Sequence, residues 1–415
     1  MGIAPGGMTG LPQMANNQKN KELITFKPFV MTSLIGQKNE NRSGMLSPLL
    51  IAIALLVSVS PIWSQSQHVT PDGKGNLTFI PGVRMQVRYE NNQIDKNNDF
   101  YIKRMRFKGK GNIYGIASYN FELKVDGTGQ FNKAPNMQLE HAWFTFPVAG
   151  NDLTFRVGLE DDVYSRNALT SDSKLLLMDR SQIKEALTRI GVTDNTIGAL
   201  IYGRPLEGRV TYSAGVFDNL GFNFANNPDA ALARRSDGAM WVGRVAYDFL
   251  EPANPAGSYD DYSSSYLDGK TRLTLGANVA HVSQAEIGDD KFSVSTYGAD
   301  LFFGVGPVSF EAEYDKYSEK LTTNGKGTIE GDGWYVQGGV LVTPKLELAL
   351  RYQTLDQSGD DHPESIGDKI DWTSIGVNYY FKGHDFKLQA EYTLKSEDIN
   401  PIDNDVLSVQ LQLSF

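Results

Sequence analysis

The stretch Val83-Arg84-Met85-Gln86-Val87-Arg88-Tyr89 decides the fold, because its apolar and polar residues alternate one by one. Successive side chains of a β-strand point to opposite faces, so this pattern predicts a strand with one apolar and one polar face. The same alternation returns near the end of the chain, in residues 384–396 and 404–415. The sequence is therefore expected to form strands whose two faces meet different surroundings.

Sixteen segments alternate in this way, and most of them are 10–13 residues long. Strands of soluble proteins usually have about 5–6 residues, whereas a tilted strand that crosses a membrane needs about 9–11. A soluble β-sandwich or propeller would also need a second layer over the apolar faces. We therefore predict an all-β, transmembrane, 16-stranded antiparallel β-barrel. Its expected strands are 77–89, 99–112, 114–127, 137–147, 151–160, 195–204, 207–217, 238–250, 270–283, 291–303, 307–318, 331–342, 345–355, 369–381, 384–396 and 404–415.

The gaps between these segments differ in length in a regular way. Most are very short after even-numbered strands and longer after odd-numbered strands, the longest being 161–194. Short turns on one rim and long loops on the other are typical of outer-membrane barrels. The polar stretch 251–269 is the exception, because it is long but falls on the short-turn side.

Aromatic residues recur near the strand ends on the apolar face. Amphipathic rings favour the interface between membrane and water, where they form girdles around a barrel. This placement predicts contact with lipid in the outer membrane of a Gram-negative bacterium. The girdle residues are expected to be Tyr89, Tyr119, Phe144, Phe146, Trp241, Tyr247, Phe249, Trp334, Tyr352, Tyr379, Phe381 and Phe415.

The one continuous apolar run, Leu46–Val59, precedes the predicted strands. Basic residues lie before it and small residues after it, as in a secretory signal peptide. We expect residues 1–66 to be an unstructured N-terminal extension plus this signal peptide, and residues 67–415 to be the barrel. A membrane anchor is the alternative, and Met31 and Met45 are alternative starts.

Composition excludes two classes of function. The chain has no cysteine, which rules out thiol catalysis and Cys-ligated zinc. Its formal net charge is −10, and it becomes more negative without residues 1–66, which hold five basic and two acidic residues. A chain of this charge repels nucleic acid, so no nucleic-acid partner is expected.

Basic residues dominate the polar faces of the first two predicted strands. In a barrel of sixteen strands the polar face lines a water-filled channel, along which guanidinium and ammonium groups offer anions weak successive sites. An ordinary lining in which acidic residues balance these charges is the alternative. The candidate pore-lining, anion-guiding residues are Arg84, Arg88, Arg104, Arg106, Lys108, Lys110 and Arg156.

The long gap 161–194 contains a second candidate site. Its apolar residues are spaced as in an amphipathic helix over Ser173–Arg189. A loop of this length with its own secondary structure is usually functional or disordered. We expect it to fold inward and constrict the channel; an exterior lid or a subunit contact is the alternative. Its basic residues are Lys174, Arg180, Lys184 and Arg189.

Two motifs make the chain resemble a known family. Phe100-Tyr101-Ile102-Lys103-Arg104-Met105-Arg106-Phe107 is similar to the F-x-(I/L)-R-R-x-R-(I/L) strand of the phosphate-selective porin O and P family. Ala168-Leu169-Thr170-Ser171, followed by Met178-Asp179-Arg180-Ser181, resembles the third-loop pattern of that family. The terminal Phe415 resembles the aromatic end that the barrel-assembly machinery recognises. The resemblance implies a homotrimer of channels with a constricting third loop and, in some members, basic ladders for phosphate or polyphosphate.

The chain departs from this family at one place. After Val157-Gly158 the family commonly has a Lys, Pro, Phe, Ser sequence, whereas this chain has Asp161-Asp162-Val163-Tyr164-Ser165. An acidic residue replaces an expected basic one, which puts phosphate selectivity in doubt.

Two other classes of function remain open beside a passive diffusion channel for small hydrophilic solutes. One is a non-conducting structural or adhesive barrel, and the other is an outer-membrane hydrolase. The histidines show no metal-binding spacing and no G-x-S-x-G motif occurs, so no catalytic residue, metal or cofactor is expected.

Overall fold

The structure is a computed structural model that describes residues 68–69, 76–92, 97–130, 136–160, 163–192, 195–218, 238–252, 258–260, 262–287, 290–321, 327–357, 369–398 and 402–415. The expected extension and signal peptide lie outside the described residues, as do Asp161 and Asp162. Among the helices of the described residues, none is long and apolar enough to cross a membrane.

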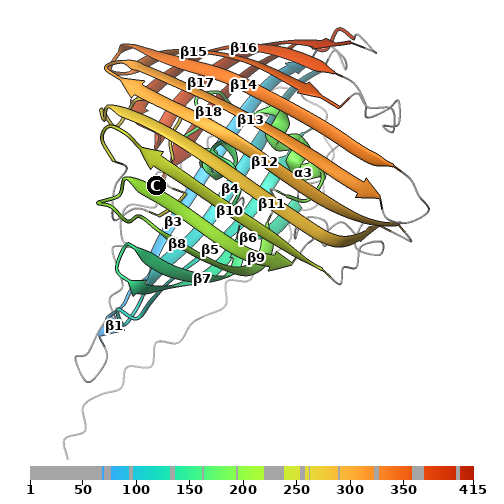
Figure 1. The fold of residues 1–415 in the computed structure, drawn as a ribbon. Helices are drawn as coiled ribbons and strands as arrows, with labels where there is room; N and C mark the ends of the chain where they lie inside the picture. Colours follow the sequence, from blue (N-terminus) through green and yellow to red (C-terminus); the bar gives the residue numbers. More distant parts are fainter. Residues whose placement is uncertain are drawn as a thin grey trace, which may run out of the picture. The chain divides into compact units, whose positions relative to one another are not determined.

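Sixteen long strands follow one another in the described part of the chain (Figure 1). Each corresponds to a predicted strand, with ends that differ by a few residues, so the predicted strand order is confirmed. The strands are β3 (Ile80–Asn92), β4 (Asn97–Ile113), β5 (Ala117–Thr128), β6 (Asn136–Ala149), β7 (Leu153–Glu160), β8 (Thr196–Gly203), β9 (Val210–Asp218), β10 (Ala239–Asp248), β11 (Arg272–Ile287), β12 (Asp290–Val305), β13 (Val308–Leu321), β14 (Thr328–Thr343), β15 (Leu346–Asp356), β16 (Ile370–Lys382), β17 (Phe386–Glu397) and β18 (Val406–Ser414).

The sheet closes on itself. Every long strand pairs antiparallel with the next, and β18 pairs with β3, where Gln412 lies opposite Gln86. A closed sheet has no free edge, so its backbone N–H and C=O groups find partners without water, as a membrane requires. The 16-stranded antiparallel barrel predicted from the sequence is confirmed.

Two short strands, β1 (His68–Val69) and β2 (Asn76–Leu77), precede the barrel. The first barrel strand was expected to begin at residue 77. Instead, Leu77 pairs with Ile113 of β4, and β3 begins at Ile80. The backbone between β2 and β3 still bonds to β4, since Thr78 N donates to Asn112 O at 3.0 Å.

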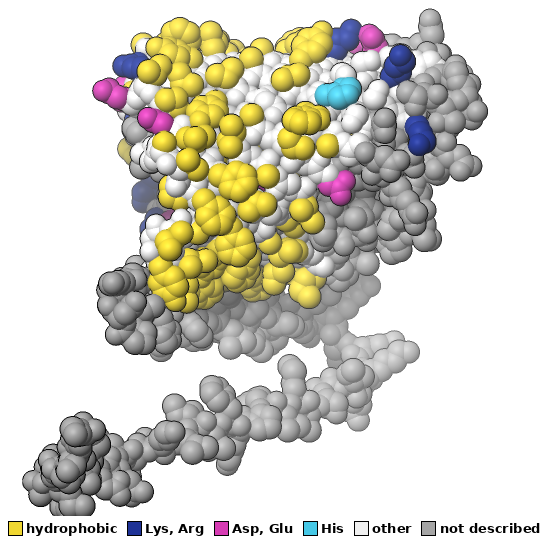
Figure 2. Space-filling model, turned by 60° about the horizontal axis from the view of Figure 1, so that its bottom comes forward, with side chains coloured by type: hydrophobic (Ala, Val, Ile, Leu, Met, Phe, Trp, Pro, Cys, Tyr) yellow, Lys and Arg dark blue, Asp and Glu magenta, His cyan; other side chains and the backbone are white. Residues whose placement is uncertain are grey.

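The two faces of the wall carry different side chains. Phe107, Trp241 and Leu350 are 40 %, 59 % and 54 % exposed on the outer face, whereas Gln86 and Glu347 are completely buried on the inner face. Figure 2 shows apolar side chains spread over the outer surface, with most of the charged ones near its edges. An exposed apolar surface of this extent is what the predicted contact with lipid requires.

The two rims differ as expected, and we call them the short-turn rim and the long-loop rim. On the short-turn rim, the aromatic pairs Tyr247–Phe249 and Tyr379–Phe381 each have ring centroids 4.8 Å apart at the end of a strand. The connection between β10 and β11 remains the one long connection on this rim. The other connections there are residues 114–116, 150–152, 204–209, 306–307, 344–345 and 383–385.

Residues Val163–Val192 form what we call the inner segment, which belongs to the long connection between β7 and β8. It contains α2 (Arg166–Leu169) and α3 (Gln182–Arg189). The helix predicted over Ser173–Arg189 is therefore wrong for its first half. Helix α3 starts only after Ser181, whose side chain accepts a hydrogen bond from Lys184 N as an N-cap.

The residues before α3 form turns and bends instead of a helix, because side chains of the barrel wall form hydrogen bonds with their backbone. Asn378 Nδ2 donates to Leu176 O at 2.8 Å, and Met178 N donates to the Glu391 carboxylate at 2.7 Å. A helix would use these backbone groups internally, so the barrel wall competes with it.

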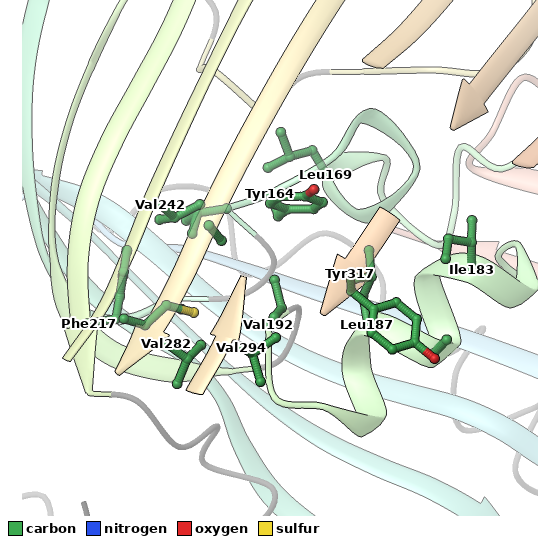
Figure 3. Packing of buried hydrophobic residues seen from close by; sticks show 14 of the residues in the cluster. Tyr164, Leu169, Ile183, Leu187, Val192, Phe217, Val242, Val282, Val294 and Tyr317 are labelled. Atoms are coloured by element: carbon green, nitrogen blue, oxygen red, sulfur yellow. The ribbon is translucent and has the colours of Figure 1, made fainter. Parts of the chain in front are cut away.

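Apolar side chains fill one half of the barrel interior. Leu187 and Ile183 of α3 and Tyr164 pack against inward-facing residues of β8–β15, including Val242 and Val294 (Figure 3). Burial of one face of α3 stabilises the inner segment against this half of the wall. The inward-facing side chains of the other half, formed by β3–β7 and β16–β18, are mainly polar.

Candidate functional site

Basic side chains from β3 and β4 lie on the inner face of that second half. Arg84 pairs across the strands with Arg106, and Gln86 pairs with Arg104. Arg84 and Arg106 are buried, whereas the alternating Phe107 is exposed on the outer face. An arginine on the lipid side would cost about 2–4 kcal/mol at mid-membrane, which explains this orientation.

Carboxylates of β5 and β6 lie beside these cations. Arg106 lies 3.2 Å from Glu122 and 3.3 Å from Glu140, and it also pairs with Asp126. Lys108 Nζ lies 2.6 Å from the same Glu122. The basic residues of β4 are therefore part of a mixed network, and their field is partly cancelled.

The inner segment adds two more carboxylates to this network. Asp172 lies 3.1 Å from Arg104 and 3.9 Å from Arg84. Arg88 donates to both carboxylate oxygens of Asp179, at 2.6 and 3.1 Å. Such bidentate pairs are strong and directional, so they fix the inner segment to β3.

Of the carboxylates of the inner segment, Asp172 and Asp179 stay ionised. Burial acts to raise the pKa of Asp172, but Arg104, Arg180 and Arg84 outweigh it and hold this pKa well below its usual value. Burial also acts to raise the pKa of Asp179, but the charge of Arg88 outweighs it and holds this pKa well below its usual value. Opposite charges nearby favour the ionised carboxylate.

A β-bulge adds a cation that the sequence pattern did not reveal. The register between β3 and β4 shifts between Gln86 and Val87, and Lys103 is the extra residue on β4. Its ammonium group lies 3.4 Å from Asp179. Strict alternation predicts the opposite face for a neighbour of Arg104, and no turn or glycine signal marks this bulge.

Arg156 lies in an aromatic setting and lines the same cavity as Arg84. It pairs with Glu160 at 2.7 Å, and its guanidinium lies 3.9 Å from the ring centre of Trp143. Tyr202 and Tyr259 flank it at 5.0 and 5.2 Å. These contacts hold the Arg156 side chain in place.

The four basic residues expected in the constriction lie at different places. Arg180 donates to the backbone oxygens of Thr170 at 3.0 Å and Ala168 at 3.3 Å, and it pairs with Asp172. Lys184 is buried, and Arg189 donates to Gln357 at 3.3 Å. Lys174 lies beside a separate cavity that Lys270 and His384 also line, at the short-turn rim.

Two cavities lie along β3–β7 and β16–β18, the first of them also reaching β15, and we call them the upper and the lower cavity. The upper cavity, of about 380 Å³, lies toward the long-loop rim and is lined by Arg88, Lys103, Arg104, Arg351 and Lys395, among others. The lower cavity, of about 360 Å³, lies toward the short-turn rim and includes Arg84, Lys108 and Lys110 in its lining. Arg180 lines both cavities, so the boundary between them lies at its side chain.

Arg166, Arg204 and Arg351 are buried arginines that were absent from the sequence-based candidates. Arg166, in α2, lies 3.3 Å from Glu311, and Arg351 of β15 donates to Asp179 O at 2.9 Å. Arg351 shows the period-two signal, since it lies between the outward-facing Leu350 and Tyr352. Arg166 lies in the short helix α2, where period-two alternation carries no information.

Comparison with known proteins identifies the family. Residues 82–415 match the family model described as phosphate-selective porin O and P. An uncharacterized protein of Aquifex aeolicus (strain VF5) is 26 % identical over 371 residues, which cover 80 % of this chain and 86 % of that protein.

Solved structures share the fold. Outer-membrane expressed OmpT of Vibrio cholerae has a TM-score of 0.56 at 11 % identity, covering 84 % of this chain and 100 % of that one. The anion-selective porin from Comamonas acidovorans has a TM-score of 0.52 at 13 % identity, covering 82 % and 100 %. Salmonella typhi OmpF, in complex with daunomycin, has a TM-score of 0.56 at 10 % identity, covering 82 % and 98 %. At these identities the likeness shows the architecture alone.

Proposed function

The chain belongs to the phosphate-selective porin O and P family, and from this premise we propose that it is a narrow channel for small hydrophilic solutes with a modest preference for anions. Membership of a porin family and a closed barrel indicate an outer-membrane channel rather than an enzyme. The preference for anions, the path of the solute and the constriction are our proposals.

One observation carries this proposal: the upper and lower cavities both border Arg180. Solutes would enter the upper cavity, pass Arg180 where the inner segment approaches β3 and β4, and continue into the lower cavity. The inner segment is thus the constriction, and Arg180 is its narrowest charged point. Asp172 and three backbone oxygens fix the Arg180 side chain, so it needs no rearrangement as a solute passes.

The preference for anions should be modest because most cations of the path are paired. Arg84, Arg104 and Arg106 each lie beside carboxylates. For Lys110, Arg351 and Lys395 no ion pair is found among the described residues. They face the two cavities and would give anions such as phosphate weak successive sites.

Planar-bilayer recordings test this proposal. We expect stable single channels whose reversal potential in a KCl gradient shows weak anion preference. The triple variant Lys110→Ala/Arg351→Ala/Lys395→Ala should move the reversal potential toward cation selectivity. Lys345→Ala/Lys382→Ala, which removes exposed charges on the short-turn rim, is the control. A reversal potential that is the same in all three proteins would contradict the anion preference.

A non-conducting structural barrel is the second candidate. The apolar cluster that fills half of the interior favours it, because it leaves little room for solutes. It predicts that the purified protein inserts into bilayers without conducting, so the same recordings decide between the two functions.

We also propose two partners. The family suggests a homotrimer, which cross-linking in native membranes would detect. Phe415 pairs with Val83 through two backbone hydrogen bonds of 2.7 and 2.9 Å, while its ring remains 61 % exposed. An exposed aromatic ring at the end of the last strand suits recognition by the barrel-assembly machinery.

A further inference from the structure

The connection between β10 and β11 enters the barrel from the short-turn rim. Its residues Ser258–Asp260 and Tyr262–Ser265 are described, and we call them the strap. Tyr259, Tyr262 and Ser264 are 1 %, 5 % and 1 % exposed, so the strap is an interior element and no surface turn. Sequence reasoning noticed this connection only as an exception to the short turns.

The first end of the strap is fixed to β7 and β8. Arg156 donates to Ser258 Oγ at 3.2 Å, and Arg204 donates to the backbone oxygen of the same serine. The ring of Tyr259 lies 4.9 Å from that of Tyr202.

The second end is fixed to β16 and the turn that follows it. Ser265 Oγ lies 3.2 Å from the hydroxyl of Tyr380, and Ser263 Oγ lies 3.2 Å from Nε2 of His384. In a closed ring of sixteen consecutive strands, β7 and β8 stand opposite β15 and β16. The strap therefore crosses the interior from one side to the other.

The middle of the strap is in contact with the inner segment. Arg166 of α2 donates to Ser263 O at 3.1 Å, and Ser264 N donates to Lys174 O at 3.2 Å. The Arg166 guanidinium also lies 4.6 Å from the ring centre of Tyr262. Two segments from opposite rims thus meet inside the barrel, and the strap lies on the short-turn side of the inner segment.

The strap also borders the solute path. Ser258 and Asp260 line the lower cavity, opposite Lys108, Lys110 and Asn120 of β4 and β5. We infer that the strap is a second constriction, which limits the size of solutes between the lower cavity and the short-turn rim. This inference rests on the proposed channel function, and it adds a size-limiting element that the inner segment does not supply.

Polymer exclusion from each side of the bilayer tests this inference. Poly(ethylene glycol) of increasing size, added on one side only, lowers conductance while it is small enough to enter from that side. Deletion of residues 258–265 leaves more residues than a turn between adjacent antiparallel strands needs, so the barrel should still close. Since the chain has no cysteine, a single Lys382→Cys substitution, labelled with an impermeant thiol reagent, identifies the short-turn side.

The deletion should increase the size of the largest polymer that enters from the short-turn side. The size threshold for entry from the long-loop side should stay unchanged, because the inner segment still limits entry there. Tyr259→Ala/Tyr262→Ala, which removes the two buried rings, should give a smaller shift in the same direction. Tyr247→Ala/Phe249→Ala, which removes two rings from the same part of the chain on the outer face, is the matched control.

An unchanged threshold from the short-turn side in a conducting, heat-modifiable deletion variant would overturn the strap as a constriction. If the wild-type protein does not conduct, the channel proposal fails. The strap inference is then supported if the deletion opens a conductance, and it is overturned if the deletion does not.

Discussion

Arg88 donates hydrogen bonds to both carboxylate oxygens of Asp179, at 2.6 and 3.1 Å, and so holds the inner segment against the barrel wall at β3. The two residues are far apart in sequence, and each belongs to a pattern that is visible there: a strand of alternating polarity and a carboxylate-Arg-Ser motif. Their contact joins the barrel wall to the inner segment, which we propose as the constriction.

Separating this pair should loosen the inner segment. In Asp179→Asn, Arg88 loses its ionic partner, and we expect noisier single channels with brief openings of higher conductance. The removed charge should also shift selectivity toward anions. Asp385→Asn, in an exposed turn on the short-turn rim, is the control. Current traces as quiet as those of the wild type would show that α3 packing alone holds the segment.

The pH dependence of the constriction follows from the depressed pKa values of Asp172 and Asp179. A carboxylate with a lowered pKa in the folded state contributes stability above its ordinary value of 3.8, and this contribution is lost as pH falls through the folded pKa. Because both folded pKa values lie well below 3.8, the inner segment should stay docked from pH 7 to pH 4. Conductance recorded over this range should show no opening transition, and a transition near pH 5 would contradict these ion pairs.

Deletion of Ser173–Arg189 should raise conductance while leaving the barrel folded, because one limiting cross-section is removed. If the strap is a second resistance in series, of similar size, the increase should be about twofold. The combined deletion with residues 258–265 should then raise conductance by more than the product of the two single effects. Heat-modifiable migration checks the fold of each variant. Wild-type conductance after the first deletion would place the constriction elsewhere.

Deletion of Phe415 should lower the amount of folded protein in the outer membrane. The exposed ring is free for recognition before the barrel closes, whereas the backbone bonds to Val83 secure closure afterwards. Phe415→Tyr keeps an aromatic end and should assemble normally. Equal amounts of heat-modifiable protein in all three cases would argue against recognition of this residue.

The barrel was predictable from the sequence because a membrane imposes period two on every strand. The side chains at Val83–Tyr89 alternate for one physical reason, the lipid on one side and water on the other. Strand ends were less predictable: β2 and β3 are separated at Thr78 and Phe79, whereas the turn signal Pro81-Gly82 lies inside β3.

The site was predictable only where it follows this period. Arg84, Arg88, Arg104 and Arg106 alternate in the sequence, whereas Lys103 reaches the upper cavity through a bulge, which alternation cannot reveal. The pairing of each arginine with carboxylates of the inner segment depends on how the loop folds. The same holds for the strap. Its sequence resembles that of an ordinary polar turn, and only the structure shows that Tyr259 lies beside Arg156 and Tyr262 beside Arg166.

Selectivity gives the sharpest test of the basic residues on β4. In Arg104→Ala/Arg106→Ala, Asp172, Glu122 and Glu140 lose cationic partners, so the reversal potential in a KCl gradient should move toward cation selectivity. The shift should be larger at low salt, where screening is weaker. Lys345→Ala/Lys382→Ala, with the same loss of charge outside the lumen, should show little change.

A second variant separates an anion-guiding track from a lining of balanced charges. Arg104→Ala/Asp172→Ala removes one ion pair and leaves the net charge of the path unchanged. If Arg104 acts on passing anions beyond its pairing with Asp172, this variant should still lose anion preference. If the pair only lines the channel as a neutral unit, the reversal potential of the variant should equal that of the wild type. In that case the remaining preference belongs to Lys110, Arg351 and Lys395, and no phosphate-selective ladder along β4 is needed to explain the channel.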